Sequence, residues 1–241
     1  MTVGVIQMAA TFVGSPSRFV APTRFDLQRP ATDPLAKPLL RGRLHQLCAL
    51  ACLPAGLRLV LDADSKGRVA AILYAVTWAA MFSASAGYHR GAHSAVARQW
   101  MRRLDHSMIF VHIGGTASAL ALLSLSPLAT TLVLGATWSG VVGGVVVKFT
   151  RLRDGGSAGS WMYAAVAVAQ AAAFPLISLS LSPGQIALLI ASGLAYGIGA
   201  VLFFKQRLDL VPAVFGYHEV WHCFTVVGGL CQYLLISQLV H

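Results

Sequence analysis

The chain has 241 residues, of which 56% are hydrophobic and only 11% are charged, and its formal net charge is +10. A soluble domain of this length usually carries about 25% charged residues, so the composition excludes an ordinary soluble protein and indicates a polytopic membrane protein. The positive charge does not indicate nucleic-acid binding, because the basic residues lie in short clusters between apolar runs, as membrane-flanking charge does.

The first 43 residues differ in kind from the rest. They contain half of the ten prolines and no long apolar run. The start of the chain lacks a basic region and a clear small-residue cleavage site, so it does not resemble a signal peptide. We therefore predict two parts: a disordered cytoplasmic tail over residues 1–43 and a membrane domain over residues 44–241.

Seven apolar segments follow in the membrane domain. A helix satisfies its own backbone hydrogen bonds in lipid, so we predict an all-α polytopic membrane protein with seven transmembrane helices. In chain order these segments are residues 44–61, 69–88, 105–126, 128–147, 161–181, 185–204 and 217–239.

The basic residues predict the orientation of these helices. Of the 18 Lys and Arg residues, all but Arg58, Lys66 and Arg68 lie in the tail or in the second, fourth and sixth loops. By the positive-inside rule this side is cytoplasmic, which places the N-terminus inside and the C-terminus outside. We expect an integral protein of the plasma (inner) membrane.

Two histidines open the last apolar segment. His218 and His222 are four residues apart, so on a helix both imidazoles lie on one face. Ionisable groups inside a membrane are costly and usually functional, and imidazole is the commonest protein ligand of metals. The pair alone leaves two interpretations open: half of a metal site, or two hydrogen-bonded histidines in the core.

The predicted topology brings two further residues to the same membrane depth. His89 ends the second span and Asp105 begins the third, both on the cytoplasmic side where the seventh span starts. Three imidazoles with an exchangeable water form the ligand set of a catalytic zinc site. We therefore predict that His89, His218 and His222 bind Zn2+.

Two residues beside these histidines are candidates for catalysis. Ser85 shares the helical face of His89, where its hydroxyl could bond a ligand or the bound water; the alternative is a bond to its own helix. Asp105 could orient or deprotonate that water; the alternatives are a helix N-cap or an ion pair with a nearby arginine. His112 shares the helical face of Asp105 and is either its partner or a packing residue.

Several segments, in this order, resemble the hemolysin III branch of the progestin and adipoQ receptor family. From about residue 37 to its end, the chain is similar to this family. The segments are 37–42, Ser85-x-x-x-His89, 104–110, 114–116 and 216–222. The resemblance implies seven helices with a cytoplasmic N-terminus and a zinc ion on the three histidines, with Ser85 and Asp105 beside it. It also implies kinship with alkaline ceramidases, and so a lipid-amide hydrolase.

Three functions remain open. The leading one is a zinc-dependent hydrolase that cleaves a lipid amide at the cytoplasmic leaflet, with membrane lipids as its partners and no nucleic acid. The alternative is a non-enzymatic cytolytic, pore-forming or receptor-like protein whose structural zinc takes Asp105 as a fourth ligand. The third is a zinc protease with Glu219 of His-Glu-x-x-His as the base, but no carboxylate follows His222 to complete the usual ligand set.

Overall fold

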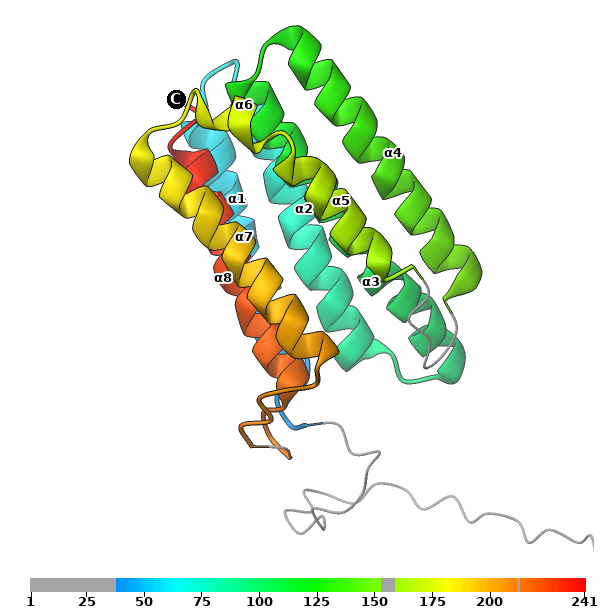
Figure 1. Cartoon of the computed structure of the whole chain (residues 1–241). Helices are drawn as coiled ribbons and strands as arrows, with labels where there is room; N and C mark the ends of the chain where they lie inside the picture. Colours follow the sequence, from blue (N-terminus) through cyan, green and yellow to red (C-terminus); the bar gives the residue numbers. More distant parts are fainter. Residues whose placement is uncertain (1–37, 153–158, 212) are drawn as a thin grey trace, which may run out of the picture. The chain divides into compact units, whose positions relative to one another are not determined.

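The computed structural model describes residues 38–152, 159–211 and 213–241, and within these ranges the chain forms helices and no β-strand. Six helices are long and apolar enough to cross a membrane, which confirms an all-α polytopic membrane protein (Figure 1). The elements are α1 (Arg43–Asp62), α2 (Arg68–Ala86), the π-helix η1 (Gly87–Gly91), α3 (Ala95–Ser124), α4 (Pro127–Arg151), α5 (Trp161–Ala171), α6 (Phe174–Ser178), α7 (Pro183–Phe204) and α8 (Tyr217–Ser237).

The fifth predicted span is not a single helix. Residues 161–181 form two shorter helices, α5 and α6, with a turn between them. Pro175 stands at the first turn of α6, where its missing N–H is tolerated, whereas inside a longer helix it would break a backbone hydrogen bond. The other six predicted spans correspond to the six segments that are long and apolar enough to cross a membrane, the second of them made of α2 and η1 together.

The helices differ in the fraction of their residues that is buried inside the bundle. In their apolar windows, α2 and α3 bury 56% and 61% of residues, whereas α1 and α4 bury 22% and α7 buries 17%. α2 and α3 therefore form the interior, and the outer helices expose leucine and valine side chains, as lipid-facing helices do. α1 packs on α2 and α8, and α7 packs on α8.

Aromatic side chains of α2 tie it to α8. Tyr74, Trp78 and Phe82 are buried in one cluster with Leu235 and other residues of α8. The Tyr74 hydroxyl also donates a 2.6 Å hydrogen bond to the carbonyl oxygen of Gly229. This contact helps to set the position of α8 against α2, and hence of the two histidine-bearing segments.

Two segments begin differently from the prediction. α3 starts at Ala95, where the Ser94 hydroxyl accepts a 3.1 Å bond from the Ala97 N–H, so Asp105 lies within the helix rather than at its N-cap. The predicted tail lies outside the described residues as far as residue 37. Residues 39–42 form a turn, and the N–H groups of Leu39 and Leu40 donate 3.1 Å bonds to the carbonyl oxygens of residues 213 and 214.

Candidate metal centre

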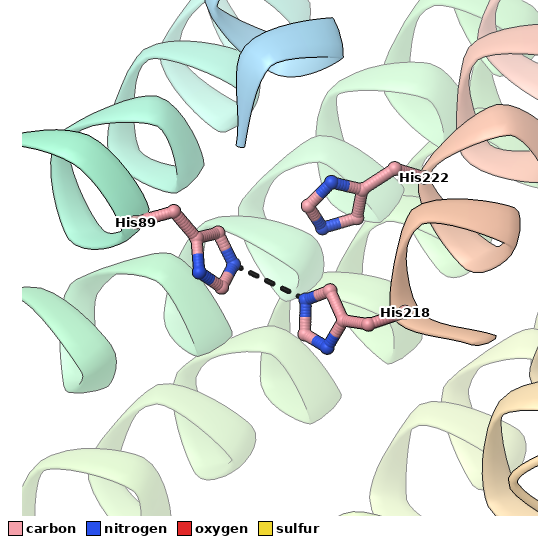
Figure 2. A group of neighbouring side chains, drawn as sticks. All are labelled: His89, His218 and His222. Carbon is pink, nitrogen blue, oxygen red and sulfur yellow. Dashed lines mark hydrogen bonds between the residues drawn. The ribbon is translucent and has the colours of Figure 1, made fainter. Parts of the chain in front are cut away.

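Three imidazoles meet at one end of the bundle. His89 comes from η1, and His218 and His222 come from the first turns of α8, with their rings turned toward one another (Figure 2). The Nε2 atoms of His89 and His218 are 3.2 Å apart, and one ligand atom from each of the three histidines lies within 4.8 Å of the others. The three positions that the sequence predicts as metal ligands therefore come together in space.

The spacing of this group suits a metal ion. Two nitrogens on a tetrahedral zinc ion, each at about 2.0–2.1 Å from the metal, lie about 3.3 Å from each other. The Nε2 atoms of His89 and His218 have nearly this separation. The group could therefore hold a metal ion.

A π-helical turn and a glycine position His89. π-Turns are rare and are frequently found at functional sites, and η1 places His89 in the last turn before the chain leaves the membrane helix. Gly42 packs directly against this residue: a Cβ atom on Gly42 would lie 2.5 Å from the Cβ atom of His89. Gly42 also has a φ of +76°, a left-handed conformation that favours glycine.

Polar contacts hold the first turn of α8 in place. The Glu219 carboxylate accepts a 2.9 Å bond from the Gly216 N–H and forms an ion pair with Arg41. Asp209 accepts a 2.6 Å bond from the Tyr217 N–H. Glu219 is buried and engaged in these contacts, and it does not belong to the histidine group. The His-Glu-x-x-His sequence thus serves here as a pair of histidines and a helix cap, which removes the base that a zinc protease would need.

The burial of His222 offers a test of whether a metal fits. Its side chain is buried, and its Nδ1 atom has no hydrogen-bond partner among the described residues. A buried polar atom without a partner costs about 1–3 kcal/mol, so a structure usually supplies one. A bound metal on one ring nitrogen, with water or a ligand at the other, would satisfy this imidazole, so the donor set fits a metal.

Ser85 and Asp105 are connected to a further histidine, His45. The Ser85 hydroxyl is 2.8 Å from Nδ1 of His45, and the Asp105 carboxyl group interacts with Ser85 and with the Arg102 guanidinium. Of the alternatives for Asp105, the N-cap is wrong, because Asp105 lies inside α3; the Arg102 guanidinium acts on its carboxyl group electrostatically. Asp105 is not a member of the group that could hold a metal ion, which among the described residues consists of the three histidines.

His45 is the residue that the sequence interpretation missed. It lies in the first turn of α1, is 4% exposed, and stacks on His222 with ring centroids 3.7 Å apart and an angle of 14° between the planes. A signal was available, because a histidine inside an apolar span is a functional candidate by default. His112, by contrast, packs against the Tyr74 ring deeper in the bundle and takes no part in the group.

Comparisons with known proteins show which family the chain belongs to. The family model described as "Haemolysin-III related" matches residues 34–233. The chain is 26% identical to "Hemolysin-3" of Bacillus cereus over 197 residues, which is 80% of this chain and 86% of the relative. It is 24% identical to "Hemolysin-3 homolog" of Bacillus subtilis over 199 residues, 80% of this chain and 89% of that protein. No solved structure matches.

Proposed function

Because the chain belongs to the haemolysin-III related family and is an integral protein of the cell membrane, we propose that it is a zinc-dependent hydrolase that cleaves the amide bond of a lipid-like substrate. The observation that carries the proposal is the convergence of His89, His218 and His222 without a carboxylate in the group. Three protein ligands leave a fourth position for water or substrate, as in catalytic zinc sites.

The three histidines would hold the metal. When bound, zinc would supply an acidified water and polarise the carbonyl group of the substrate. Imidazole nitrogens suit zinc among the common metals, and oxygen-only ligand sets would be expected for magnesium or calcium. Side chains of the protein would carry out the proton transfer.

Asp105 and Ser85 would carry the proton and orient the water. In amide hydrolysis the water oxygen forms a bond to the carbonyl carbon, the C–N bond breaks, and a proton passes from the water to the amine nitrogen. Asp105 would accept this proton and deliver it, because its carboxyl group contacts Ser85, which lies 2.8 Å from His45, the ring stacked on His222. Ser85, in contact with both Asp105 and His45, would orient the carboxyl group and the attacking water.

The depth of the site suggests the class of substrate. His89 and His222 belong to helices that are apolar enough to cross a membrane, and both lie near one end of these helices. Such a site suits a molecule with a polar amide near the membrane surface and an acyl tail in the lipid, as in ceramides. The basic loops at this end place it on the cytoplasmic side, which stays a prediction from charge.

The test is hydrolysis by the purified protein in detergent, loaded with zinc and offered ceramides and other long-chain acyl amides. We expect release of fatty acid by the wild type. Both Asp105→Asn and Ser85→Ala should retain zinc. We expect Asp105→Asn to lower this activity by about 100-fold or more, and Ser85→Ala to lower it about tenfold. Ser83→Ala, an exposed serine on the same helix, is the matched control. A zinc-loaded wild type that cleaves no amide in the panel contradicts the proposal.

A structural zinc with Asp105 as the fourth ligand is the competing arrangement. It predicts that Asp105→Asn lowers zinc affinity as strongly as loss of a histidine does. Retention of zinc by Asp105→Asn, with an exchangeable water at the metal seen by X-ray absorption, would support the open catalytic site instead. The same measurement therefore separates an enzyme from a non-enzymatic membrane protein.

A further inference from the structure

His45 of α1 contacts both α2 and α8 at the histidine end of the bundle, although it is not a member of the three-histidine group that could hold a metal. Its Nδ1 atom is 2.8 Å from the Ser85 hydroxyl on α2, and its Nε2 atom is 3.0 Å from the Thr225 hydroxyl on α8. Both ring nitrogens are therefore engaged, which leaves neither of them available to bind a metal.

The faces of the His45 ring are also occupied. One contact is the stacked ring of His222, at 3.7 Å and 14°, and another is the edge of Phe82, with centroids 4.8 Å apart and an angle of 60° between the planes. A flat ring that is fixed at both nitrogens and packed against a second flat ring restricts the rotation of that second ring. His45 thus limits the orientations that His222 can adopt.

The hydrogen bonds around His45 have a defined direction. The Thr225 hydroxyl donates its single proton to the carbonyl oxygen of His222, at 2.8 Å, so it can only accept from Nε2 of His45. In a neutral imidazole one nitrogen donates and the other accepts, so Nδ1 accepts from the Ser85 hydroxyl. The Ser85 proton therefore points toward His45, and its oxygen lone pairs are left to accept from water.

We propose that His45 is a positioning residue of the metal centre: its ring face orients the ligand His222, and its ring edge orients the Ser85 hydroxyl. The inference rests on the metal site of the proposed function but not on the amide substrate. It adds α1 to a site whose predicted residues all come from α2, η1, α3 and α8. Partners that orient a ligand typically change metal affinity by about 10–100-fold when they are removed.

The experiment measures zinc affinity by competition with a chelator, and the visible absorption spectrum of the Co2+-substituted protein, for wild type and His45 variants. We expect His45→Ala to bind zinc about 10–100-fold more weakly than wild type and to shift the cobalt bands. His45→Phe retains the flat ring against His222, so its zinc affinity should stay within about threefold of wild type. Cys52→Ala, another buried residue of α1, is the matched control and should leave both readouts unchanged.

If His45→Ala does not fold, His45→Gln takes its place, because glutamine can bond both hydroxyls but lacks the ring face, and it should weaken zinc binding to a similar extent. Folded His45→Ala or His45→Gln with wild-type zinc affinity and an unchanged cobalt spectrum would overturn the positioning role while leaving the metal site intact. A folded wild type that binds no zinc would remove the metal site and the positioning role together. None of these measurements uses amide hydrolysis. The positioning role of His45 and the hydrolase proposal can therefore be tested separately.

Discussion

The two ends of the bundle connect the regions around α1, α2 and α8 through different kinds of contact. At the histidine end, side chains add to the backbone bonds of Leu39 and Leu40: Arg41 pairs with Glu219, and the three imidazoles gather around one point. At the opposite end, where α1 turns into α2, the backbone makes the connection: the Asp64 N–H donates a 2.9 Å bond to the carbonyl oxygen of Val240. A function that needs particular side chains is thus concentrated at one end, and the other end closes the fold.

Each end of the bundle also contains a glycine that leaves no room for a side chain. Gly42 lies against the side chain of His89, and a Cβ atom on Gly67 would lie 2.6 Å from the carbonyl oxygen of Val240. Crowding at the first glycine displaces a candidate ligand, whereas crowding at the second displaces only backbone. Substitutions at the two ends should therefore have separable effects on metal binding and on stability.

The largest effect is expected from removing a ligand. His218→Ala should abolish zinc binding, because two imidazoles alone hold zinc weakly where three are required. His241→Ala removes an exposed histidine at the other end and should leave about one zinc per chain, as in the wild type. Elemental analysis of the detergent-purified proteins measures this directly. Equal zinc in both variants would show that the two ends do not differ in this way.

The next largest effect is expected at the two glycines. Gly42→Ala forces a side chain into a left-handed conformation, at a cost of about 1–2 kcal/mol, and pushes on His89. We expect lower thermal stability and zinc affinity reduced by about tenfold or more. Gly67→Ala should lower the melting temperature but leave zinc affinity unchanged. If Gly67→Ala weakens zinc binding as much as Gly42→Ala does, the claim that only the histidine end affects the metal is wrong.

A smaller effect is expected from the ion pair at the histidine end. Arg41→Ala leaves the buried carboxylate of Glu219 without its cation, and we expect a loss of about 1–3 kcal/mol, moderated because the Arg41 side chain is 17% exposed. Adding Glu219→Gln removes the charge but keeps an acceptor for the Gly216 N–H, so the double variant should recover part of the loss. Thermal unfolding in detergent measures both. A double variant less stable than Arg41→Ala would contradict this account.

The smallest effect is expected at the opposite end. Asp64 accepts hydrogen bonds from the N–H groups of Lys66 and Gly67, at 2.9 and 2.6 Å, just before α2. Asp64→Ala should therefore cost about 1 kcal/mol of stability, as the loss of a helix cap does, with no change in zinc affinity. Asp62→Ala, which removes only an exposed ion pair with Arg58, is the control and should leave the melting temperature unchanged. Altered zinc binding in Asp64→Ala would mean that the ends are coupled.

Much of the candidate site follows from local properties of the sequence. Apolar runs of sufficient length predict spans, and their order and flanking charges place His89, Asp105 and the α8 histidines at one depth. Helical periodicity then assigns His218 and His222 to one face. Each of these inferences uses only neighbouring residues, and the structure brings the three histidines together accordingly.

The family assignment also came from the sequence alone. The order of short motifs, from residues 37–42 to residues 216–222, resembles hemolysin III proteins, and the family model that matches residues 34–233 confirms this. The motifs indicated this family although the identity to the two named relatives is only 24–26%.

Only the tertiary structure decided which faces meet. α1 is apolar nearly all round, so its sequence does not indicate which side packs on α2 and α8, and His45 could not be assigned to the site. In lipid, helix orientation depends on close packing and polar contacts between helices rather than on an apolar stripe. The ion pair between Arg41 and Glu219 and the bond between His45 and Ser85 join residues far apart in the chain, and they exist only once the helices have packed.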